Sequence, residues 1–429
     1  MSSKASNITA QIERAMSGAR IFPFWRDSNL VPAPEPEQIG ETSADLVVIG
    51  GGFTGLWAAL QAKEASPGRD ILLLEANTIA SGASGRPGGI ISTSIMHGLI
   101  NTVRTFPKDV AILEKLGQEN MDGFTETLDR HGIDADIEWS GEMVLAISEA
   151  DVGEVKEEYG LHLTHGHNVS WLDRDALQQQ IRSPAFHSGF WSKDRSGTVH
   201  PAKLAWGLKK AIRHLGVRVH ENSPMLRIET DRGISVVHTP HGRIRANRIL
   251  LATDSWGVAD RNIRRRMFVM HDRALATEPL SAEQISGIGW KNRQGIYDSG
   301  SQLNYMRLTK DNRIVFGGHL DYFFGNGIQS DVNREPSTYY PLLKHFFGKF
   351  PQLDDIRITN VTLGPIGVST RMAIQFQKSR MGNAIWVGGY SGFGVGASRF
   401  GARLALAMLD GTQCRELELD FARKSPNYI

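Results

Sequence analysis

Apolar and polar positions near the start of the chain follow a strand, helix, strand order. The apolar run Leu46–Ile49 has the length of a buried strand, and a helical stretch from Leu56 to Ala62 follows it. A second apolar run covers Ile71–Leu74. Two buried strands joined by a helix within about thirty residues predict a βαβ unit with parallel strands.

The middle of the chain contains segments with the apolar spacing of helices and segments with the spacing of strands. Residues 108–131 carry apolar side chains at helical spacing, which predicts an amphipathic helix. Residues 137–148 have the pattern of two short strands, and 204–216 that of a helix ending at Gly216. The stretch 217–253 predicts strands around a hairpin, and 271–319 is mostly strand, with a hairpin turn at 310–312.

The C-terminal part predicts a third buried strand, Ile385–Gly388, then a glycine-rich loop and a helix from Ala397 to Leu409. The order of all these segments predicts the α/β class, α+β overall: a Rossmann-type domain with an inserted antiparallel-sheet substrate domain. We expect an N-terminal arm (1–43), a discontinuous cofactor-binding domain (44–105, 190–265 and 360–429) and a substrate domain (106–189 and 266–359).

The N-terminal arm combines prolines with aromatic side chains. Pro32, Pro34 and Pro36 predict an extended, stiff stretch. The preceding Phe24 and Trp25 are too apolar for a free tail. We therefore expect the arm to lie across the body of the protein or across a partner subunit.

Composition narrows the class of protein. The chain has 429 residues, 41% of them hydrophobic and 22% charged, which suits an ordinary globular protein with two connected domains. A net charge of +2 argues against a nucleic-acid partner. One cysteine, Cys414, excludes an internal disulfide, and we expect no metal site. We expect no transmembrane segment, no signal peptide, a cytoplasmic location and a monomer or small homo-oligomer.

The glycines after the first strand carry the clearest chemistry. Gly50, Gly52 and Gly55 stand at G-x-G-x-x-G spacing, with Phe53 and Thr54 between them. They suit a tight turn, close approach to a pyrophosphate and close helix–strand packing, while the helix N-terminus offers N–H groups to phosphates.

The acid at the end of the second strand completes this unit. Glu75, followed by Ala76, stands about twenty residues past the last glycine, where a carboxylate accepts ribose hydroxyls. The unit therefore predicts FAD or NAD, and the acid argues against NADP.

A second glycine loop favours FAD over NAD. It follows the C-terminal strand and contains Gly389, Gly392, Phe393 and Gly394 ahead of a helix. This arrangement aims a second helix N-terminus at the sheet edge, where it would stabilise negative charge on the pyrimidine end of a reduced flavin.

Motifs along nearly the whole chain carry a family resemblance: FPFWRDS, ADLVVIGGGFTGLWAAL, GASGRPGG, VHPAKLAWGLKKA, NRILLATDSW, QLNYMRLTKDNRIVFGG and GGYSGFGVGASRFGARLALA. The chain resembles the D-amino-acid-oxidase-like FAD-dependent oxidoreductase superfamily, and within it the branch of bacterial gamma-glutamylputrescine oxidoreductases. The first glycine motif and the last motif are typical of the superfamily, whereas FPFWRDS and GASGRPGG indicate the branch.

The resemblance implies a set of FAD contacts. Adenosine would lie at the first glycine motif and Glu75, with the Met225 backbone near adenine and Ala252 and Thr253 near the pyrophosphate. The pyrimidine end would face the second glycine loop. The flavin ring would lie against Ser84, Gly85, Arg86, Gly88 and Gly89.

The resemblance also bears on how FAD is held. Relatives with covalent flavin use a cysteine shortly before the second glycine loop or a histidine in the 84–89 loop. Here Cys414 follows the last predicted helix and Arg86 fills the other position, so we expect non-covalent FAD.

Three residues depart from the branch pattern. Pro87 stands where GASGRNGG has asparagine, and in TLGPIGVSTR Thr362 replaces a tryptophan and Arg371 an aspartate. Amino-acid oxidases of the superfamily place carboxylate-binding arginines where this chain has Ile366 and Gly392. The substrate is therefore expected to be an amine rather than a simple alpha-amino acid.

Substrate-binding candidates come from the strand-rich part. Tyr305 and Arg307 are two apart in a predicted strand, so both face one side, where they suit a polar or anionic group; an exposed face with a surface ion pair is the alternative. Arg371 is a second candidate. Phe393 and Tyr390 are candidate pocket walls or plain core.

The leading hypothesis is an FAD-dependent oxidoreductase for the C–N bond of an amine, acylated polyamine-like or another small amine. It forms an imine by hydride transfer to flavin N5, and O2, a quinone or another acceptor reoxidises the flavin. One alternative is an oxidase or dehydrogenase of an N-methyl or alpha-amino acid, with Arg307 or Arg371 binding its carboxylate. The other is a non-catalytic FAD-binding protein.

Overall fold

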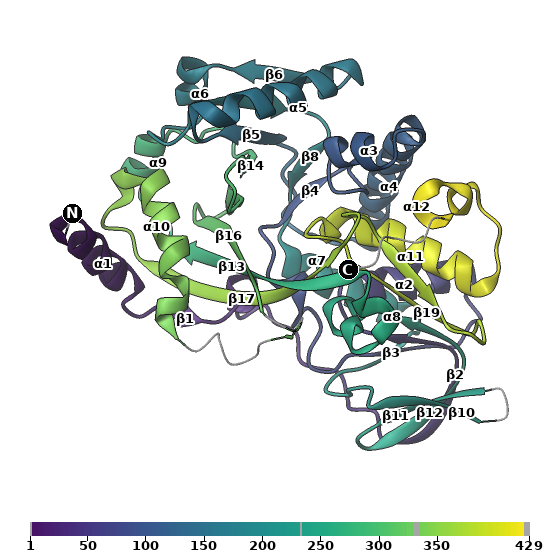
Figure 1. Cartoon of the computed structure of the whole chain (residues 1–429). Helices are drawn as coiled ribbons and strands as arrows, with labels where there is room; N and C mark the ends of the chain where they lie inside the picture. The colour runs from purple at the N-terminus through teal and green to yellow at the C-terminus, as the bar shows by residue number, and fades with distance from the viewer. Residues whose placement is uncertain (1, 232–233, 324, 326, 329–334, 424–429) are drawn as a thin grey trace.

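Two large sheets organise the chain, which we describe from a computed structural model covering residues 2–231, 234–323, 325, 327–328 and 335–423. One has eight described strands and a parallel centre, and the other has nine. Figure 1 shows the first with β2, β3 and β10–β12 at the bottom right and the second curving above it. The mixed α/β fold is the predicted one.

The eight-stranded sheet is built around five parallel strands. Across the sheet they are β9 (Arg218–His220), β3 (Ile71–Leu74), β2 (Gly40–Ile49), β12 (Gly242–Leu251) and β19 (Ala384–Gly388). Antiparallel strands β10 (Arg227–Asp231), β11 (Ile234–Thr239) and β18 (Gln375–Lys378) extend its edges.

Strand β2 shows why this sheet needs helices on one face. Leu46 and Val48 pack into a core with three helices, whereas Val47 and Ile49 face a second core under the β10–β12 hairpins. The three helices are α2 (Phe53–Ala65), α7 (Pro201–His214) and α11 (Gly394–Asp410). Helix α2 lies between the other two and is apolar on nearly all sides, as a fully buried helix must be.

The nine-stranded sheet is mostly antiparallel, as expected of the inserted part, but contains the parallel pairs β1–β17 and β14–β5. Its strand order is β1 (Arg20–Ile21), β17 (Ile358–Ser369), β13 (Met267–Thr277), β16 (Ile314–Tyr322), β15 (Asn304–Leu308), β14 (Gly295–Asp298), β5 (Glu142–Ala146), β7 (Ser188–Ser192) and β6 (Val169–Leu172).

Several helices cover the nine-stranded sheet or join the two sheets. Those not yet named are α3 (Leu99–Thr105), α4 (Val110–His131), α5 (Val152–Thr164), α6 (Arg174–Gln180), α8 (Arg261–Arg264), α9 (Ala282–Ile288), α10 (Tyr340–Lys349) and α12 (Asp420–Arg423). A small sheet pairs β4 (Ile90–Ser92) with β8 (Ser196–Thr198).

The structure departs from the expected segments and boundaries at several places. Helix α4 (110–131), expected with the substrate domain, buries its apolar face in the core beside α2, whose aromatic Trp57 it contacts. Conversely, β17 (358–369) and β7 (188–192), expected largely with the cofactor-binding domain, lie in the nine-stranded sheet. Of the two strands expected in 137–148, only β5 forms, with an isolated bridge at Glu138.

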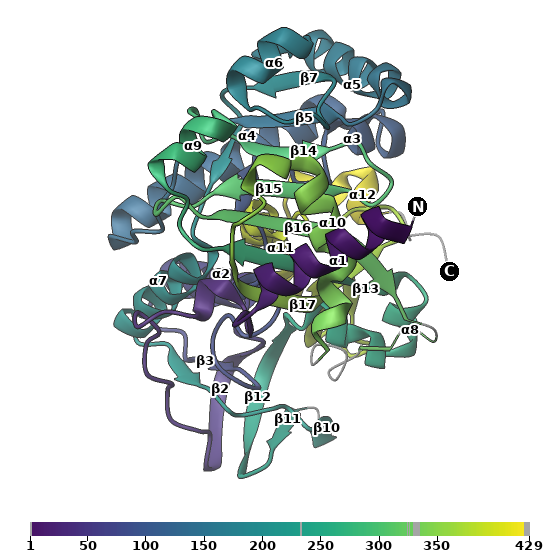
Figure 2. The ribbon, with the colours of Figure 1, turned by 90° about the vertical axis from the view of Figure 1, so that its left-hand side faces the viewer.

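The N-terminal arm begins with a helix, α1 (Ser2–Met16), which the sequence pattern did not indicate. Figure 2 shows α1 crossing in front of α10 and β17. Ile12 is fully buried there, in the core that contains α10. Past α1, β1 pairs with β17, and the proline-rich 31–39 stretch has no regular element. The arm is therefore part of the folded body.

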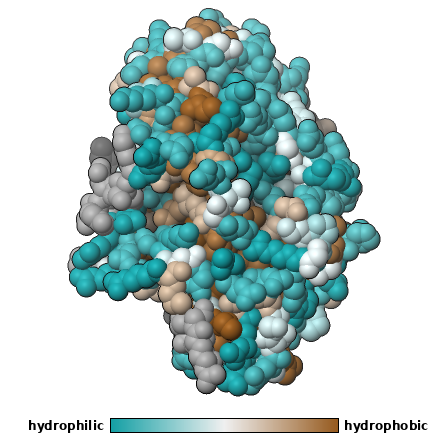
Figure 3. Space-filling model, turned by 90° about the vertical axis from the view of Figure 1, so that its right-hand side faces the viewer, coloured by the Kyte–Doolittle hydropathy of each residue, from teal (hydrophilic) through white to brown (hydrophobic). Residues whose placement is uncertain are grey.

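The face of the molecule shown in Figure 3 is mostly hydrophilic, and its hydrophobic residues lie in separate groups. In the described parts of the chain, no helix is both long and apolar enough to cross a membrane. Over the same residues, no group of three or more His, Cys, Asp or Glu side chains is placed to hold a metal ion.

Truncating Ile12 tests whether α1 is integral to the fold. Ile12→Ala should lower the free energy of unfolding by about 2–5 kcal/mol, because it opens a cavity in a closed core. Urea unfolding followed by tryptophan fluorescence measures this change. The exposed neighbour Glu13 provides the control, and Glu13→Ala should stay within about 0.5 kcal/mol of the unchanged protein. Equal, small effects of both substitutions would show that α1 is dispensable.

Candidate active site

The first glycine motif forms the turn between β2 and α2. Gly50 has φ +113°, and a Cβ there would lie 2.4 Å from the Ala252 carbonyl oxygen. A Cβ on Gly55 would lie 1.9 Å from the Gly50 carbonyl oxygen, so the helix could not approach the turn. Gly52 is the N-cap of α2 and supplies no side-chain cap. The turn therefore has the close helix–strand packing that the G-x-G-x-x-G spacing predicts, and α2 begins directly after it.

Glu75 lies at the end of β3, beside that turn. Its carboxylate accepts hydrogen bonds from the N–H groups of Gly51 (2.7 Å) and Asn77 (2.9 Å). Burial raises the pKa of Glu75, and these N–H groups oppose that effect. The Ser223 N–H donates to the Glu75 carbonyl (2.8 Å), which brings the 223–225 segment, including Met225, beside Glu75 and Ala76.

Ala252 and Thr253 follow β12 at the same edge of the sheet. The Ala252 N–H donates to the Ile49 carbonyl (2.8 Å), which places this segment against the first turn. Thr253 is the N-cap of a short 3-10 helix, η4 (Asp254–Ala259).

The 84–89 loop packs against both the turn and the nine-stranded sheet. The Ser84 hydroxyl accepts from the Phe53 N–H at 2.9 Å. Gly88 lies directly under the Tyr305 ring, since a Cβ would be 2.5 Å from that ring. Gly89 has φ +74° and faces the Val199 carbonyl. Glycine is therefore required at both positions, for space at Gly88 and for conformation at Gly89.

The second glycine loop is held by one carboxylate. Asp254 accepts from the N–H of Gly389 (2.8 Å) and from the N–H of Gly367 in β17 (3.0 Å). Burial raises the pKa of Asp254, and both N–H groups oppose this effect. Asp254 thus joins the ends of β12 and β19 to the nine-stranded sheet. It stands in the NRILLATDSW motif, but the motif did not indicate this role.

The two glycine loops lie side by side. The Thr54 hydroxyl in α2 donates to the Tyr390 hydroxyl in the second loop at 2.8 Å. Gly392 has φ +90°, and Phe393 is the N-cap of α11 without a side-chain cap. The N-termini of α2 and α11 therefore both open at the carboxyl edge of the parallel sheet, where ligands of such sheets bind.

A cavity of about 400 Å³ lies between the 86–90 segment, the second glycine loop and the nine-stranded sheet. One wall consists of the 86–90 segment, another of Ser391–Phe393, and a third of residues from β13, β16 and β17. Its polar lining groups among the described residues are Arg86, His97, Asp272, Tyr297, Tyr305 and Ser391.

Asp272 and Tyr305 form a hydrogen-bonded pair in the lining of this cavity. The Tyr305 hydroxyl donates to Asp272 Oδ2 at 2.6 Å. Burial raises the pKa of Asp272 to about 7, although the Tyr305 hydroxyl and the Gly318 N–H stabilise its anion. Burial also holds the pKa of Tyr305 well above its usual range. The other oxygen, Oδ1, is buried and has no hydrogen bond of ordinary geometry with the described residues. Asp272 was not among the site residues predicted from the sequence.

Arg307 shares a strand face with Tyr305, as expected, but does not line the cavity. It is 2% exposed and donates to the carbonyls of Val199 (2.7 Å) and Gly89 (3.3 Å). Its guanidinium also lies 5.5 Å from the Trp25 ring centroid. Arg307 therefore supports the 84–89 loop from behind.

Arg371 is also placed away from the cavity lining. It donates to the Phe421 carbonyl at 2.9 Å and lies over the Phe106 ring at 5.5 Å from its centroid. These contacts connect the end of β17 to α12. Of the three expected substrate-binding residues, only Tyr305 reaches the cavity.

The other two departures from the branch pattern have structural partners. Arg86 Nη1 donates to the Thr362 hydroxyl at 2.6 Å and to the Leu363 carbonyl at 3.2 Å. The Pro87 carbonyl accepts from the Trp25 indole N–H at 2.7 Å, which fastens the N-terminal arm to this loop. Cys414 lies beyond α11, at the start of the final short helices.

A parallel sheet with two helix N-termini at its carboxyl edge is the arrangement of a nucleotide-binding domain. The family model described as "FAD dependent oxidoreductase" (DAO) matches residues 45–408. The chain therefore belongs to the DAO family of FAD-dependent oxidoreductases, and FAD is its cofactor, as predicted.

Individual relatives agree with this assignment. The chain is 29% identical to a probable oxidoreductase, OrdL, of Haemophilus influenzae over 86% of this chain and 83% of that one. It is 29% identical to the gamma-glutamylputrescine oxidoreductase of Escherichia coli over 86% of this chain and 84% of that one. The glycine oxidase structure from Geobacillus kaustophilus matches the fold with a TM-score of 0.72 at 16% identity, over 87% of this chain and 96% of that one.

Removing one acceptor from Asp254 tests its joining role. Asp254→Asn should lower the free energy of unfolding by about 1–3 kcal/mol, because one backbone N–H loses its partner. It should also weaken FAD retention, measured as flavin fluorescence released on dilution. Asp260→Asn is the control, because Asp260 caps α8 at the exposed end of the same segment and asparagine caps equally well. Unchanged stability and retention in Asp254→Asn would contradict the joining role.

Proposed function

We propose that the protein oxidises the C–N bond of a small amine, of which acylated polyamines are one class, to an imine. The observation that carries this proposal is the cavity itself: it contains a carboxyl group, Asp272, whose Oδ1 has no partner among the described residues, and both Nη atoms of its lining arginine, Arg86, are hydrogen-bonded, which leaves only the buried Nε without a partner. Such a lining suits an ammonium group rather than the carboxylate of an amino acid.

The FAD assignment follows the geometry of the loops. The first turn (Gly50, Gly52, Phe53, Thr54 and Gly55) would hold the pyrophosphate, with Ala252 and Thr253 beside it. Glu75 would exchange its bond to the Gly51 N–H for the ribose hydroxyls. The flavin ring would lie against the 84–89 loop, with its pyrimidine end toward Gly389 and 392–394. When bound, FAD supplies the two-electron acceptor for the hydride leaving the carbon next to nitrogen.

The chain's own residues prepare the amine. Asp272 Oδ1 has a free lone pair and would accept a proton from the substrate ammonium, leaving the neutral amine that oxidation requires. The Tyr305 hydroxyl holds Oδ2 and fixes the carboxylate orientation. Glycines at 88 and 317 leave room for the Tyr305 ring on either side. Tyr305 is therefore a positioning residue in this proposal.

The engaged arginines argue against the amino-acid alternative. Arg307 and Arg371 donate to backbone carbonyls outside the cavity. Arg86 lines the cavity, but its Nη atoms bond Thr362, Leu363 and Ser81. A substrate carboxylate would have to break these bonds, each of them partly or fully buried.

Anaerobic flavin reduction tests the function. A panel of alkylamines, diamines, N-acyl diamines and amino acids is mixed with the FAD-loaded protein, and bleaching near 450 nm, the absorption band of oxidised flavin, is followed. We expect bleaching by amines and none by simple alpha-amino acids. Bleaching by amino acids alone would support the amino-acid alternative, and bleaching by no compound would support a non-catalytic role.

Replacing Asp272 tests the amine-binding step. Asp272→Asn should lower kcat/KM for the best amine on the order of 100-fold, because asparagine cannot accept the proton. In the unchanged protein kcat/KM should rise with pH through about 7, where Asp272 ionises, and this limb should be absent in Asp272→Asn.

The control for this variant is Asp311→Asn, since Asp311 lies in the exposed turn of the β15–β16 hairpin and does not line the cavity. It should leave both kcat/KM and its pH dependence unchanged. Full FAD content in both variants shows that each is folded. An Asp272→Asn enzyme that keeps the pH limb would assign that limb to another group.

A further inference from the structure

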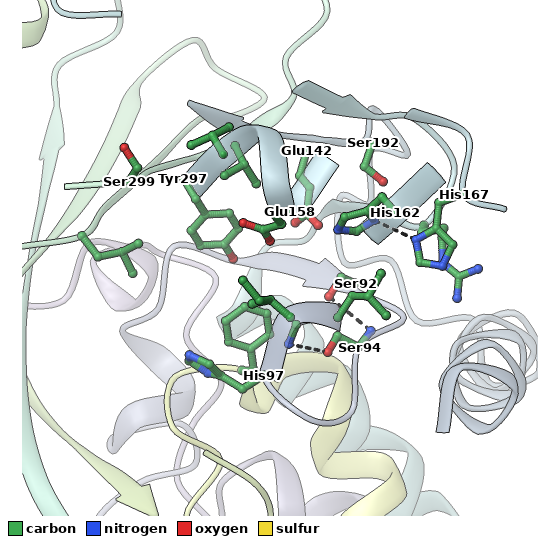
Figure 4. Close-up of a pocket in the computed structure, with 18 of the residues that line it drawn as sticks. Ser92, Ser94, His97, Glu142, Glu158, His162, His167, Ser192, Tyr297 and Ser299 are labelled. Carbon is green, nitrogen blue, oxygen red and sulfur yellow. Dashed lines mark hydrogen bonds between the residues drawn. The ribbon is translucent and has the colours of Figure 1, made fainter. Parts of the chain in front are cut away.

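A second cavity, of about 300 Å³, adjoins the one described above. The two share four lining residues, His97, Tyr297, Leu303 and Phe393. The second cavity extends from this shared wall toward β5 and α5 (Figure 4). A molecule longer than the first cavity could therefore continue into the second without crossing the body of a sheet.

Two glutamates from different elements point into the second cavity. Figure 4 shows the carboxylates of Glu142 from β5 and Glu158 from α5 directed toward the space beside Tyr297. Neither carboxyl group forms a hydrogen bond with the described residues, and the cation that acts on Glu158 is Arg104, which itself pairs with Glu157 at 3.6 Å. Burial and mutual repulsion raise the pKa of Glu142 to about 8, and burial is the main cause that raises the pKa of Glu158 to about 7.

The other acids of this cavity are already neutralised or exposed. Glu114 accepts from His167 (2.7 Å) and Arg195 (3.1 Å). Asp298 pairs with Lys349 at 3.0 Å. Glu154 is exposed. The carboxyl groups of this cavity that have no partner in the described chain are therefore those of Glu142 and Glu158.

We propose that the second cavity binds a distal cationic group of the substrate, so that the enzyme prefers amines carrying a positive charge at each end. This inference rests on the proposed amine oxidation. One end would lie at Asp272 and the other between Glu142 and Glu158, with the connecting chain passing the aromatic wall of Tyr297 and Phe393, whose rings are stacked at 6.1 Å. A methylene chain suits such a wall, and an ammonium group suits the pair of carboxyl groups at the distal end.

Matched substrates and one variant test the subsite. Straight-chain α,ω-diamines and n-alkylamines of the same carbon number are compared by kcat/KM. The unchanged enzyme should favour the diamine on the order of 10-fold at its best length. Glu142→Gln should remove most of this preference while leaving kcat/KM for the monoamine and the FAD content unchanged.

Glu149→Gln is the matched control, because Glu149 lies just before α5 and its side chain is 90% exposed. It should behave like the unchanged enzyme. Glu158→Gln supplies a second variant and should act like Glu142→Gln. An equal loss on both substrate types, or a preference unaffected by both glutamine variants, would overturn the inference while amine bleaching still supports the proposed function. Absence of bleaching by every amine would instead overturn the proposed function.

The pH dependence separates this subsite from Asp272. The diamine preference should grow as pH rises from 6 to 9, since the two glutamates ionise in that range. The groups facing them are Arg104, Glu154, His162, Glu114, His167, Arg195, Tyr297, Asp298 and His97. Burial lowers the pKa values of His162 and His97 to about 4, so neither titrates in this range. A ratio constant with pH would contradict the assignment.

Discussion

The site depends on one carboxylate between the two sheets. Asp254 accepts from the backbone N–H groups of Gly389 and Gly367, so it links the second glycine loop to β17. Few side chains can bind two N–H groups from separate strands, and a carboxylate with two acceptor oxygens is suited to it. Because β17 forms one cavity wall and the glycine loop another, the distance across the cavity is set by this residue. The Thr54–Tyr390 hydrogen bond adds the first glycine loop to the same unit.

Around this unit, charged side chains divide into those that support backbone and those that face open space. Arg307 and Arg86 donate hydrogen bonds to backbone carbonyls of the 84–89 loop and of β17. The guanidinium group suits this role because its donors are strong and directional. Asp272, Glu142 and Glu158 instead keep oxygens that nothing in the described chain occupies. The two arginines therefore hold the cavity walls together, and the carboxyl groups face the open space. A carboxylate-binding site would instead require a cation facing that space.

Much of the fold could be predicted from the sequence, because glycine spacing and buried strands are local signals. The βαβ unit, the second glycine loop and the β15–β16 hairpin are where their patterns placed them. Helix α1 and the membership of β17 were missed, because both depend on contacts between distant segments. The same limit explains Arg307: strand periodicity correctly gave its face, but whether that face opens on a cavity or on backbone carbonyls is a tertiary property. The sequence contains one sign of Asp272 that was not used: it is the one acid in FVMHDRALA, a segment that is mostly apolar.

The strand order of the parallel sheet has a consequence for biosynthesis. Strand β2 lies between β3, which follows it closely in the chain, and β12, which is made much later, and β12 in turn pairs with β19 near the C-terminus. On the ribosome, β2 therefore emerges with an unpaired edge and an apolar helix, α2, whose partner α11 is translated near the end. The two halves of the nucleotide-binding sheet can therefore meet only after almost the whole chain has been made.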